Sequence, residues 1–397
     1  MKILQIGQLP KEMGGNYTTG IARVVGELSK QKFDDDEIFL YGTNIPEKKA
    51  KKLCNYLHQY MGYRINPFGM VLDMFKNPMR TWKAWHNYKK YTNANVLHME
   101  FFRYNFKKAI DIVRPDLIHF HGSGLIAMHY ANLETEIPIL LTLHGLMWCG
   151  EDIDTPQEIF WKKNAQITLP LANYYTTLNQ KALGKMLKLG VEHNKITIIP
   201  NGVDSKKFYF SSSKRKEFRD SYQVGQNTIV FITVGLVVDR KGQFSFLKIL
   251  ESLNIDYQYW IIGNGPDFNM IKDYIQNKGL EQKVKLLGYI SDIDLYQYHS
   301  AADIYAHAST VEGQALSEIE AYSTGLRIIV NKLISDTVIG DAEKDSDKYY
   351  IADFDNINPS EIIGWIKKET DERTSVQKFD WSTIAQRYAE VYFNIIK

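Results

Sequence analysis

Two glutamates in the second half of the chain have a residue type and a spacing that suit ligand binding. Glu312 and Glu320 are separated by seven residues. If both were helical they would lie about 12 Å apart along the helix axis, so they can act together only if Glu312 lies in a loop and Glu320 in the helix that follows. One carboxylate could then accept two hydrogen bonds from the hydroxyls of a ribose, and the other could hold a sugar hydroxyl.

The surrounding sequence predicts the elements that position these glutamates. Residues 302–308 and 327–330 are rich in β-branched and aromatic residues and predict strands. Residues 317–324 fit a short helix that Gly325 can end in a left-handed conformation. Ligands of such βαβ units lie beyond the carboxyl ends of the strands. Four backbone N–H groups at the helix start then favour an anion such as a diphosphate, namely those of Gly313, Gln314, Ala315 and Leu316.

A structural explanation of Glu320 fits the same spacing. Ser317-x-x-Glu320 has the pattern of a capping box, in which the glutamate folds back on the first turn of its own helix. Spacing alone does not separate capping from ligand binding, so both alternatives stay open here.

Histidines and glycines mark further candidate ligand positions. Two strand-like segments carry His119, His121 and His144 at or next to their ends. A histidine at a strand end is more often structural than catalytic, although an imidazole can hydrogen-bond a ligand or offset diphosphate charge. The first predicted strand, residues 2–7, leads into a glycine-rich loop with Gly15 and Asn16, which would let the backbone approach phosphates.

Two acidic pairs have a pattern that can bind a metal ion. Asp152 with Asp154, and Asp292 with Asp294, each spell Asp-x-Asp. Neither pair ends a buried strand, and both are interpreted as acids at helix starts. We therefore predict no metal ion and no other cofactor.

The composition is that of a globular protein with ample cores, at 44% hydrophobic and 24% charged residues. Two cysteines, Cys54 and Cys149, provide no disulfide framework and favour a reducing compartment. The first residues lack the apolar run of a signal peptide, and no apolar run is long enough to span a membrane. These features predict a cytoplasmic protein, with association at the inner face of the cell membrane as an option.

The option of a membrane contact comes from the basic first half of the chain. Residues 1–200 carry more Lys and Arg than Asp and Glu, and residues 68–91 interleave basic side chains with Trp82, Trp85 and two tyrosines. Such a segment can lie in the interface of an anionic membrane. The favoured interpretation is a helix whose aromatic side chains are core and whose lysines are solvated. Nucleic acid binding is not expected, because no recognition motif accompanies the charge.

Several motifs, in order, resemble those of one enzyme family. Residues 312–320 resemble the Glu-x7-Glu signature of family-four glycosyltransferases, which are retaining enzymes of the GT-B fold. Pro200-Asn-Gly-Val-Asp204 resembles the family's hinge, and residues 263–266 its Gly-x-Gly-Pro turn. Two departures stand out: the family usually has Phe-Gly where Gln314-Ala315 stands, and an arginine where Leu236 stands.

This resemblance implies an α/β protein with two Rossmann-like domains, whose parallel sheets face a central cleft. Residues 1–200 would form the acceptor-side domain, and a C-terminal helix, 379–397, would cross back to it. Residues 201–378 would bind the nucleotide-sugar donor. The polar run 211–217 is interpreted as part of the connection between the domains.

The resemblance also assigns roles to residues. It implies catalytic roles for His144, Lys241 and Glu312, with His121 as the second choice among the histidines. Lys241 would bind the donor diphosphate, and Arg240 is the candidate to replace the missing arginine. The implied donor site also contains Gly15, Asn16, Gly263, Gly288, the segment Gly313 to Leu316, and Glu320.

The implied activity is retaining transfer of a hexose from a nucleotide diphosphate sugar, UDP-sugar being favoured. The acceptor would be a glycan, a protein or a lipid-linked saccharide, in surface polysaccharide or glycolipid biosynthesis. Two alternatives stay open: a sugar-nucleotide epimerase of the same fold, and a non-catalytic partner subunit of a glycosyltransferase. Redox chemistry with a dinucleotide is disfavoured because Gly-x-Gly-x-x-Gly does not follow the first strand.

Overall fold

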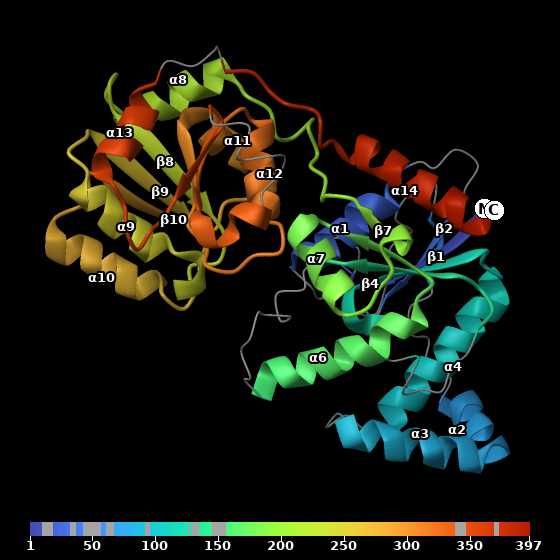
Figure 1. The fold of residues 1–397 in the computed structure, drawn as a ribbon. Helices are drawn as coiled ribbons and strands as arrows, with labels where there is room; N and C mark the ends of the chain where they lie inside the picture. The colour runs from blue at the N-terminus through green and yellow to red at the C-terminus, as the bar shows by residue number, and fades with distance from the viewer. Residues whose placement is uncertain are drawn as a thin grey trace. The chain divides into compact units, whose positions relative to one another are not determined.

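The computed structural model of the chain divides into two compact units (Figure 1). Unit 1 comprises Met1–Ile199 with Ser382–Lys397, and unit 2 comprises Pro200–Trp381. The residues that the structure describes are 1–9, 19–31, 37–42, 57–60, 67–91, 96–125, 128, 135–144, 156–337, 347–368 and 373–397. Gly15, Asn16, Asp152, Asp154 and both cysteines lie outside them.

The described part of unit 1 is built on a parallel sheet of seven strands. Their spatial order is β3 (Leu57–Tyr60), β2 (Glu37–Gly42), β1 (Lys2–Gly7), β4 (Leu117–His121), β5 (Ile139–Leu143), β6 (Tyr174–Thr177) and β7 (Ile196–Ile198). Strands β4 and β5 are buried along their whole length. Parallel strands that are covered on both faces read as continuous apolar runs, which is why the sequence located them well.

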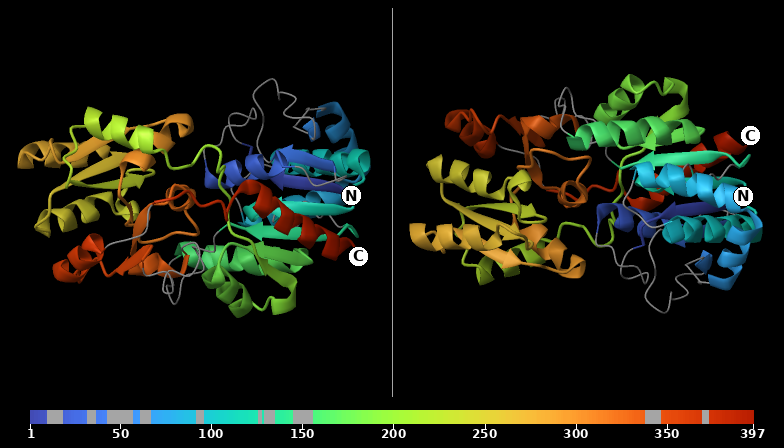
Figure 2. Two further views of the ribbon diagram at one scale, coloured as in Figure 1. Left: turned by 90° about the horizontal axis from the view of Figure 1, so that it is seen from above. Right: turned by 90° about the horizontal axis from the view of Figure 1, so that it is seen from below.

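The helices of unit 1 include one from the far end of the chain. They are α1 (Gly20–Ser29), α2 (Pro67–Lys76), α3 (Pro78–Tyr91), α4 (Val96–Val113), α6 (Pro156–Thr168), α7 (Gln180–Lys188) and α14 (Trp381–Ile396). Helix α14 packs within unit 1, as Figure 2 shows, with Tyr388 and Tyr392 fully buried. Its Arg387 donates to the carbonyl of Ile198 at 2.7 Å. The predicted return of the C-terminal helix is confirmed.

Unit 2 has a parallel sheet of six strands in its described residues. Their order is β10 (Val284–Gly288), β9 (Tyr257–Ile262), β8 (Ile229–Val234), β11 (Ile304–His307), β12 (Arg327–Asn331) and β13 (Tyr349–Ala352). The helices are α8 (Ser212–Ser221), α9 (Gln243–Ser252), α10 (Phe268–Lys278), α11 (Asp292–Ala301), α12 (Leu316–Ser323) and α13 (Pro359–Lys367). The predicted pair of parallel α/β units is therefore confirmed.

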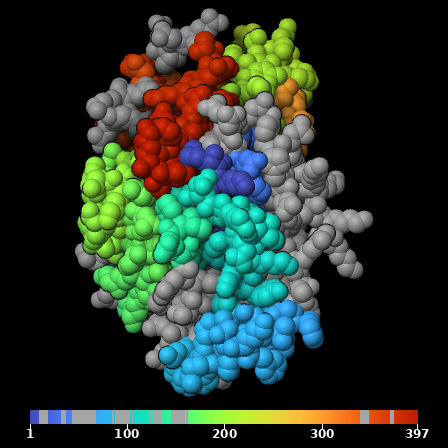
Figure 3. Space-filling view, turned by 90° about the vertical axis from the view of Figure 1, so that its right-hand side faces the viewer, coloured from blue at the N-terminus to red at the C-terminus, as the bar shows by residue number. Residues whose placement is uncertain are grey.

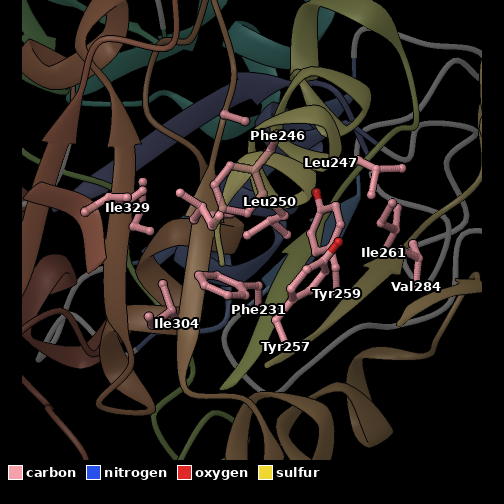
Figure 4. Close-up of a cluster of buried hydrophobic side chains, with 14 of the residues drawn as sticks. Phe231, Phe246, Leu247, Leu250, Tyr257, Tyr259, Ile261, Val284, Ile304 and Ile329 are labelled. Atoms are coloured by element: carbon pink, nitrogen blue, oxygen red, sulfur yellow. The ribbon is translucent and has the colours of Figure 1, made fainter. Parts of the chain in front are cut away.

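Strand β8 shows how unit 2 obtains a core on each face of its sheet. Phe231 packs with Phe246 and Leu250 of α9 in one buried cluster (Figure 4). Val230 and Ile232 alternate with it along the strand and belong to the second cluster, with residues of α11 and α12. Each large apolar side chain buried in this way stabilises the fold by roughly 1.5–3 kcal/mol.

The prediction for residues 211–217 is wrong, because this polar run begins helix α8. Ser211 is the N-cap, and its hydroxyl accepts a hydrogen bond from the Lys214 N–H at 3.3 Å. Arg215 donates to the Ala302 carbonyl at 2.9 Å and Arg219 to an Asp303 carboxylate oxygen at 3.0 Å. A helix without buried residues is thus held by charged hydrogen bonds to the turn between α11 and β11, and such bonds leave no apolar periodicity in the sequence.

Candidate functional site

The loops that follow β8, β9 and β10 meet through backbone contacts at the carboxyl end of the unit 2 sheet. The Gly263 N–H donates to the Gly288 carbonyl at 2.7 Å. Gly263 has a φ of +130°, and a Cβ there would lie 1.9 Å from the Gly235 carbonyl oxygen. No side chain fits at this crossing. The two glycines predicted for donor binding therefore lie at the sheet edge where ligands of this architecture bind, and their contact with a donor stays a prediction.

The loop after β8 and the loop after β11 are packed against each other in the same way. Residues 239–241 form a 3₁₀ turn that ends at Gly242, whose φ is +69°. A Cβ on Gly242 would lie 2.2 Å from the Ala308 carbonyl oxygen. The Arg240 carbonyl accepts a hydrogen bond from the Thr310 N–H at 2.9 Å. This packing brings Lys241 of the first loop to Glu312 of the second, and the two side chains form an ion pair.

The ion pair keeps the carboxylate of Glu312 charged. Burial by itself would raise the pKa of this carboxyl group, but the Lys241 ammonium, His307, and hydrogen bonds from Lys241 and Ser309 together lower it. The Ser309 hydroxyl donates to the carboxylate at 2.9 Å. The arrangement presents an ammonium group that can bind an anion beside a carboxylate that can accept hydrogen bonds from hydroxyls.

Glu320 lies within helix α12 and does not form the predicted capping box. Helix α12 begins after Ala315, which is its N-cap and has no side-chain cap. Ser317 is inside the helix, and its hydroxyl accepts a hydrogen bond from Tyr305 at 2.8 Å, so it is not the N-cap that a capping box requires. Glu312 thus lies in the loop and Glu320 in the helix, where its side chain is buried. Its contact with a ribose stays a prediction.

Gln314 has a structural partner that the sequence analysis did not foresee. Its side-chain oxygen accepts a hydrogen bond from the Asn201 N–H at 2.7 Å, and its carbonyl accepts one from the Asn201 side chain at 3.3 Å. The residue in place of the family's aromatic therefore holds Asn201 against the loop that precedes α12. Contact between a donor and the backbone of residues 313–316 is a prediction that the structure does not test.

The candidate replacement for the missing arginine lies at the surface. Arg240 is exposed and forms no ion pair with any described residue. Leu236, at the position of the missing arginine, is 50% exposed. Lys241 is thus the cation that the described residues place against Glu312.

A buried polar group that was not predicted from the sequence lies near this pair. His307, at the end of β11, lies with its Nδ1 2.9 Å from a carboxylate oxygen of Glu318. The Tyr349 hydroxyl donates to the other oxygen of that carboxylate at 3.1 Å. The sequence did contain a signal for His307, because it lies at the end of a predicted strand. The same feature had marked His144 as a candidate.

In unit 1 the three strand-end histidines lie together. Nδ1 of His121 is 2.9 Å from Nε2 of His144. Nδ1 of His119 is 2.8 Å from the hydroxyl of Tyr392 on α14, and its Nε2 is 2.6 Å from the Thr142 hydroxyl. Burial lowers the pKa of His119 to about 3, that of His144 to about 4, and that of His121 well below its usual range. All three are neutral at pH 7, which favours hydrogen bonding over charge compensation for His144.

The described residues contain no group of three or more His, Cys, Asp or Glu side chains that could hold a metal ion. Asp292 and Asp294 lie in the first turn of α11, as predicted. No helix among the described residues is long and apolar enough to cross a membrane.

Comparison with known structures defines the class of fold. HepE of Anabaena, solved in complex with UDP-glucose, superposes with a TM-score of 0.64 at 19% identity, over 99% of this chain and 100% of that one. The fold is GT-B.

Sequence comparison then defines the family. The family described as "Glycosyl transferases group 1" matches residues 214–372, and "Glycosyltransferase Family 4" matches residues 45–207. Together the two models match most of the chain, which belongs to the group 1 and family 4 glycosyltransferases that they describe.

Two curated relatives share 26% and 28% sequence identity with this chain. Alpha-monoglucosyldiacylglycerol synthase of Acholeplasma laidlawii is 26% identical over 240 residues, which are 55% of this chain and 59% of that relative. UDP-Gal:alpha-D-GlcNAc-diphosphoundecaprenol alpha-1,3-galactosyltransferase of Escherichia coli is 28% identical over 272 residues, 65% of this chain and 67% of its own. The chain thus spans about three fifths of the length of the first of these relatives.

Proposed function

We propose that this protein is a retaining glycosyltransferase that moves a hexose from a UDP-sugar to a glycan or lipid-linked acceptor. The observation that carries the proposal is the ion pair between Lys241, in the loop after β8, and Glu312, in the loop after β11. The carboxylate of Glu320 lies on helix α12, which follows the second loop. Membership of the family and the UDP-glucose bound to HepE support the choice of donor.

The proposed chemistry needs no nucleophile from the protein. In a front-face displacement the acceptor hydroxyl attacks the anomeric carbon from the side that the diphosphate leaves. The new C–O bond forms as the bond to the diphosphate oxygen breaks, and the hydroxyl proton passes to that leaving oxygen. Catalysis then rests on positioning and on stabilising the leaving group. Lys241 and the N–H groups of residues 313–316 would hold the diphosphate. Glu312 would bind sugar hydroxyls and Glu320 the ribose, while neutral His144 would bind through a hydrogen bond. The proposal includes no metal ion.

A binding experiment tests the donor assignment. We expect one nucleotide among UDP, GDP, ADP and CMP to bind, with UDP favoured, and Glu320→Gln to weaken that binding by about 10-fold or more because a charged hydrogen bond is lost. Isothermal titration calorimetry measures both. Glu281→Gln, at an exposed carboxylate, is the control that should leave binding unchanged. Failure of all four nucleotides to bind would favour a non-catalytic partner subunit, and turnover without an acceptor would favour an epimerase.

The acceptor side of the proposal rests on an exposed apolar surface in unit 1, which we call the α2–α3 surface. Its large hydrophobic side chains recur at helical spacing and are 39–79% exposed: Phe68, Val71, Leu72, Phe75, Met79 and Trp82. The expectation that the aromatic side chains of this segment are core is therefore wrong for Trp82. In the space-filling view, α2 and α3 form the lower end of the displayed face (Figure 3).

The charges around the α2–α3 surface favour an anionic membrane as its partner. Residues 67–91 hold five Lys or Arg residues and one acid, Asp73. Asp73 pairs with Arg103 of α4 and Arg80 of α3, which neutralise it and tie α2 and α3 to the body of unit 1. Exposed apolar side chains flanked by lysines such as Lys76 and Lys83 are typical of helices that lie in a membrane interface. The two curated relatives carry lipid in their names, as expected for enzymes whose acceptors reside there.

Replacing two aromatic side chains tests this surface. We expect the double variant Phe75→Ser/Trp82→Ser to bind vesicles that contain phosphatidylglycerol at least about 10-fold more weakly, because each apolar side chain contributes roughly 1.5–3 kcal/mol on leaving water. Vesicle sedimentation measures binding. Phe393→Ser is the matched control, since this phenylalanine of α14 is 49% exposed but lies outside the surface. Equal loss in the control, or no vesicle binding by the unchanged protein, would contradict the proposal.

A further inference from the structure

A row of three polar side chains crosses neighbouring strands of the unit 1 sheet and ends at His144. Gln5 of β1 is fully buried, His121 ends β4, and His144 follows β5. Nε2 of Gln5 lies 3.0 Å from Nε2 of His121, and Nδ1 of His121 lies 2.9 Å from Nε2 of His144. Strands β1, β4 and β5 are adjacent, so this row is built into the sheet.

The orientation of the Gln5 amide follows from its other neighbour. The same amide nitrogen lies 3.4 Å from the carbonyl oxygen of Val25 on α1. A carbonyl only accepts hydrogen bonds, so an amide oxygen in this position would face another oxygen. The atom that points at both Val25 and His121 is therefore the NH₂ group, and it donates to Nε2 of His121.

The remaining protons in the row are then fixed one after another. A neutral imidazole carries one N–H, so His121, whose Nε2 accepts, must carry its proton on Nδ1. That proton is donated to Nε2 of His144. Nε2 of His144 therefore accepts, and the proton of His144 resides on Nδ1. Burial depresses the pKa of both histidines and keeps them neutral, so each ring carries a single N–H.

We propose that Gln5 and His121 are positioning residues that hold His144 in the tautomer with its proton on Nδ1. His144 then presents a hydrogen-bond donor, and among the described residues no acceptor faces that nitrogen. This inference rests on the proposed function. It assigns to the Nδ1–H group of His144, as its hydrogen-bond partner, an oxygen atom of the ligand, either from a phosphate or from a sugar hydroxyl. The ligand oxygen needs no proton of its own for this contact.

A second polar chain beside the row provides the control. The Thr142 hydroxyl lies 2.6 Å from Nε2 of His119 and 2.5 Å from the Thr176 hydroxyl. The centroid of the His119 ring lies 4.1 Å from that of His121, with the ring planes tilted by 38°, but no hydrogen bond between these two rings is formed. Thr176→Val thus removes a buried hydroxyl of the same sheet without touching the row through Gln5.

Two-bond ¹H–¹⁵N NMR of the ¹⁵N-histidine-labelled full chain reads the tautomers directly. We expect His121 and His144 each to show a protonated Nδ1 and an unprotonated Nε2, and Thr176→Val to leave this pattern unchanged. A proton on Nε2 of His144 would overturn the proposal. The spectrum of the free protein does not depend on nucleotide binding. It therefore tests the proposed tautomers independently of the proposed function.

Two variants of His121 test its role as a donor. Asparagine can place an NH₂ group near the position of the histidine Nδ1, so His121→Asn should keep the Nδ1–H form of His144 and most of the activity. His121→Leu and Gln5→Leu remove the donors and should yield a mixture of tautomers, with kcat reduced roughly 10-fold and a smaller change in KM for the donor. Equal kcat values for His121→Asn and His121→Leu, both with an unchanged His144 spectrum, would also refute the proposal.

Discussion

Lys241→Met is expected to lower kcat/KM for sugar transfer by at least about 100-fold, as loss of a charged group that stabilises a leaving group does in other enzymes. Lys241 is the cation that the packed loops place against Glu312. Methionine keeps the length and the apolar stem of lysine but cannot bind a diphosphate. Initial rates with a UDP-sugar and an acceptor, together with calorimetric binding of UDP, measure the effect.

The same substitution leaves a largely buried carboxylate without its cation, so stability must be separated from function. We expect Lys241→Met to destabilise unit 2, and the double variant Lys241→Met/Glu312→Gln to recover part of that loss without recovering activity. Lys272→Met, at an exposed lysine of α10, should change neither quantity. Near-normal turnover by Lys241→Met would remove Lys241 from the mechanism.

Gly263→Ala is expected to destabilise unit 2 by more than about 3 kcal/mol, because two costs coincide. The backbone at Gly263 has a φ of +130°, which a residue with a side chain rarely adopts, and the new Cβ would lie 1.9 Å from the Gly235 carbonyl oxygen. The obstacle is backbone, so no side-chain rotation can relieve it. Chemical denaturation followed by circular dichroism measures the change in the free energy of unfolding.

For a second glycine of unit 2, we expect substitution by alanine to increase the stability. Gly364 lies within helix α13, and a Cβ there would meet no atom within 4 Å. Gly364→Ala should therefore raise the free energy of unfolding by about 0.5–1 kcal/mol, since alanine loses less backbone entropy in a helix. If Gly263→Ala were as harmless as Gly364→Ala, the close backbone crossing at the carboxyl end of the sheet would be wrong.

The order of strands and helices around the candidate site could be predicted because it depends on local patterns. Buried parallel strands are continuous apolar runs, which is why the predicted strands 302–308 and 327–330 agree with β11 and β12 to within two residues. Gly325 closes α12 with a φ of +75°, as its position after a helical pattern indicated. The placement of Glu312 before α12 and Glu320 within it follows from the same short segment.

Which side chains meet across the fold could not be predicted in this way. Lys241 and Glu312 are 71 residues apart in sequence, and the backbone packing of the loops after β8 and β11 brings them together. The row from Gln5 to His144 likewise depends on the neighbourhood of β1, β4 and β5, which no local pattern encodes.

The sequence by itself determined the family, the two α/β units and the loop-and-helix positions of the two glutamates, because motif spacing and hydrophobic periodicity are properties of short segments. The tertiary structure decided that the polar run 211–217 is a helix tied down by Arg215 and Arg219, and that Trp82 is exposed. An amphipathic pattern shows that a helix has an apolar face, but whether that face is covered depends on what the rest of the chain packs against it.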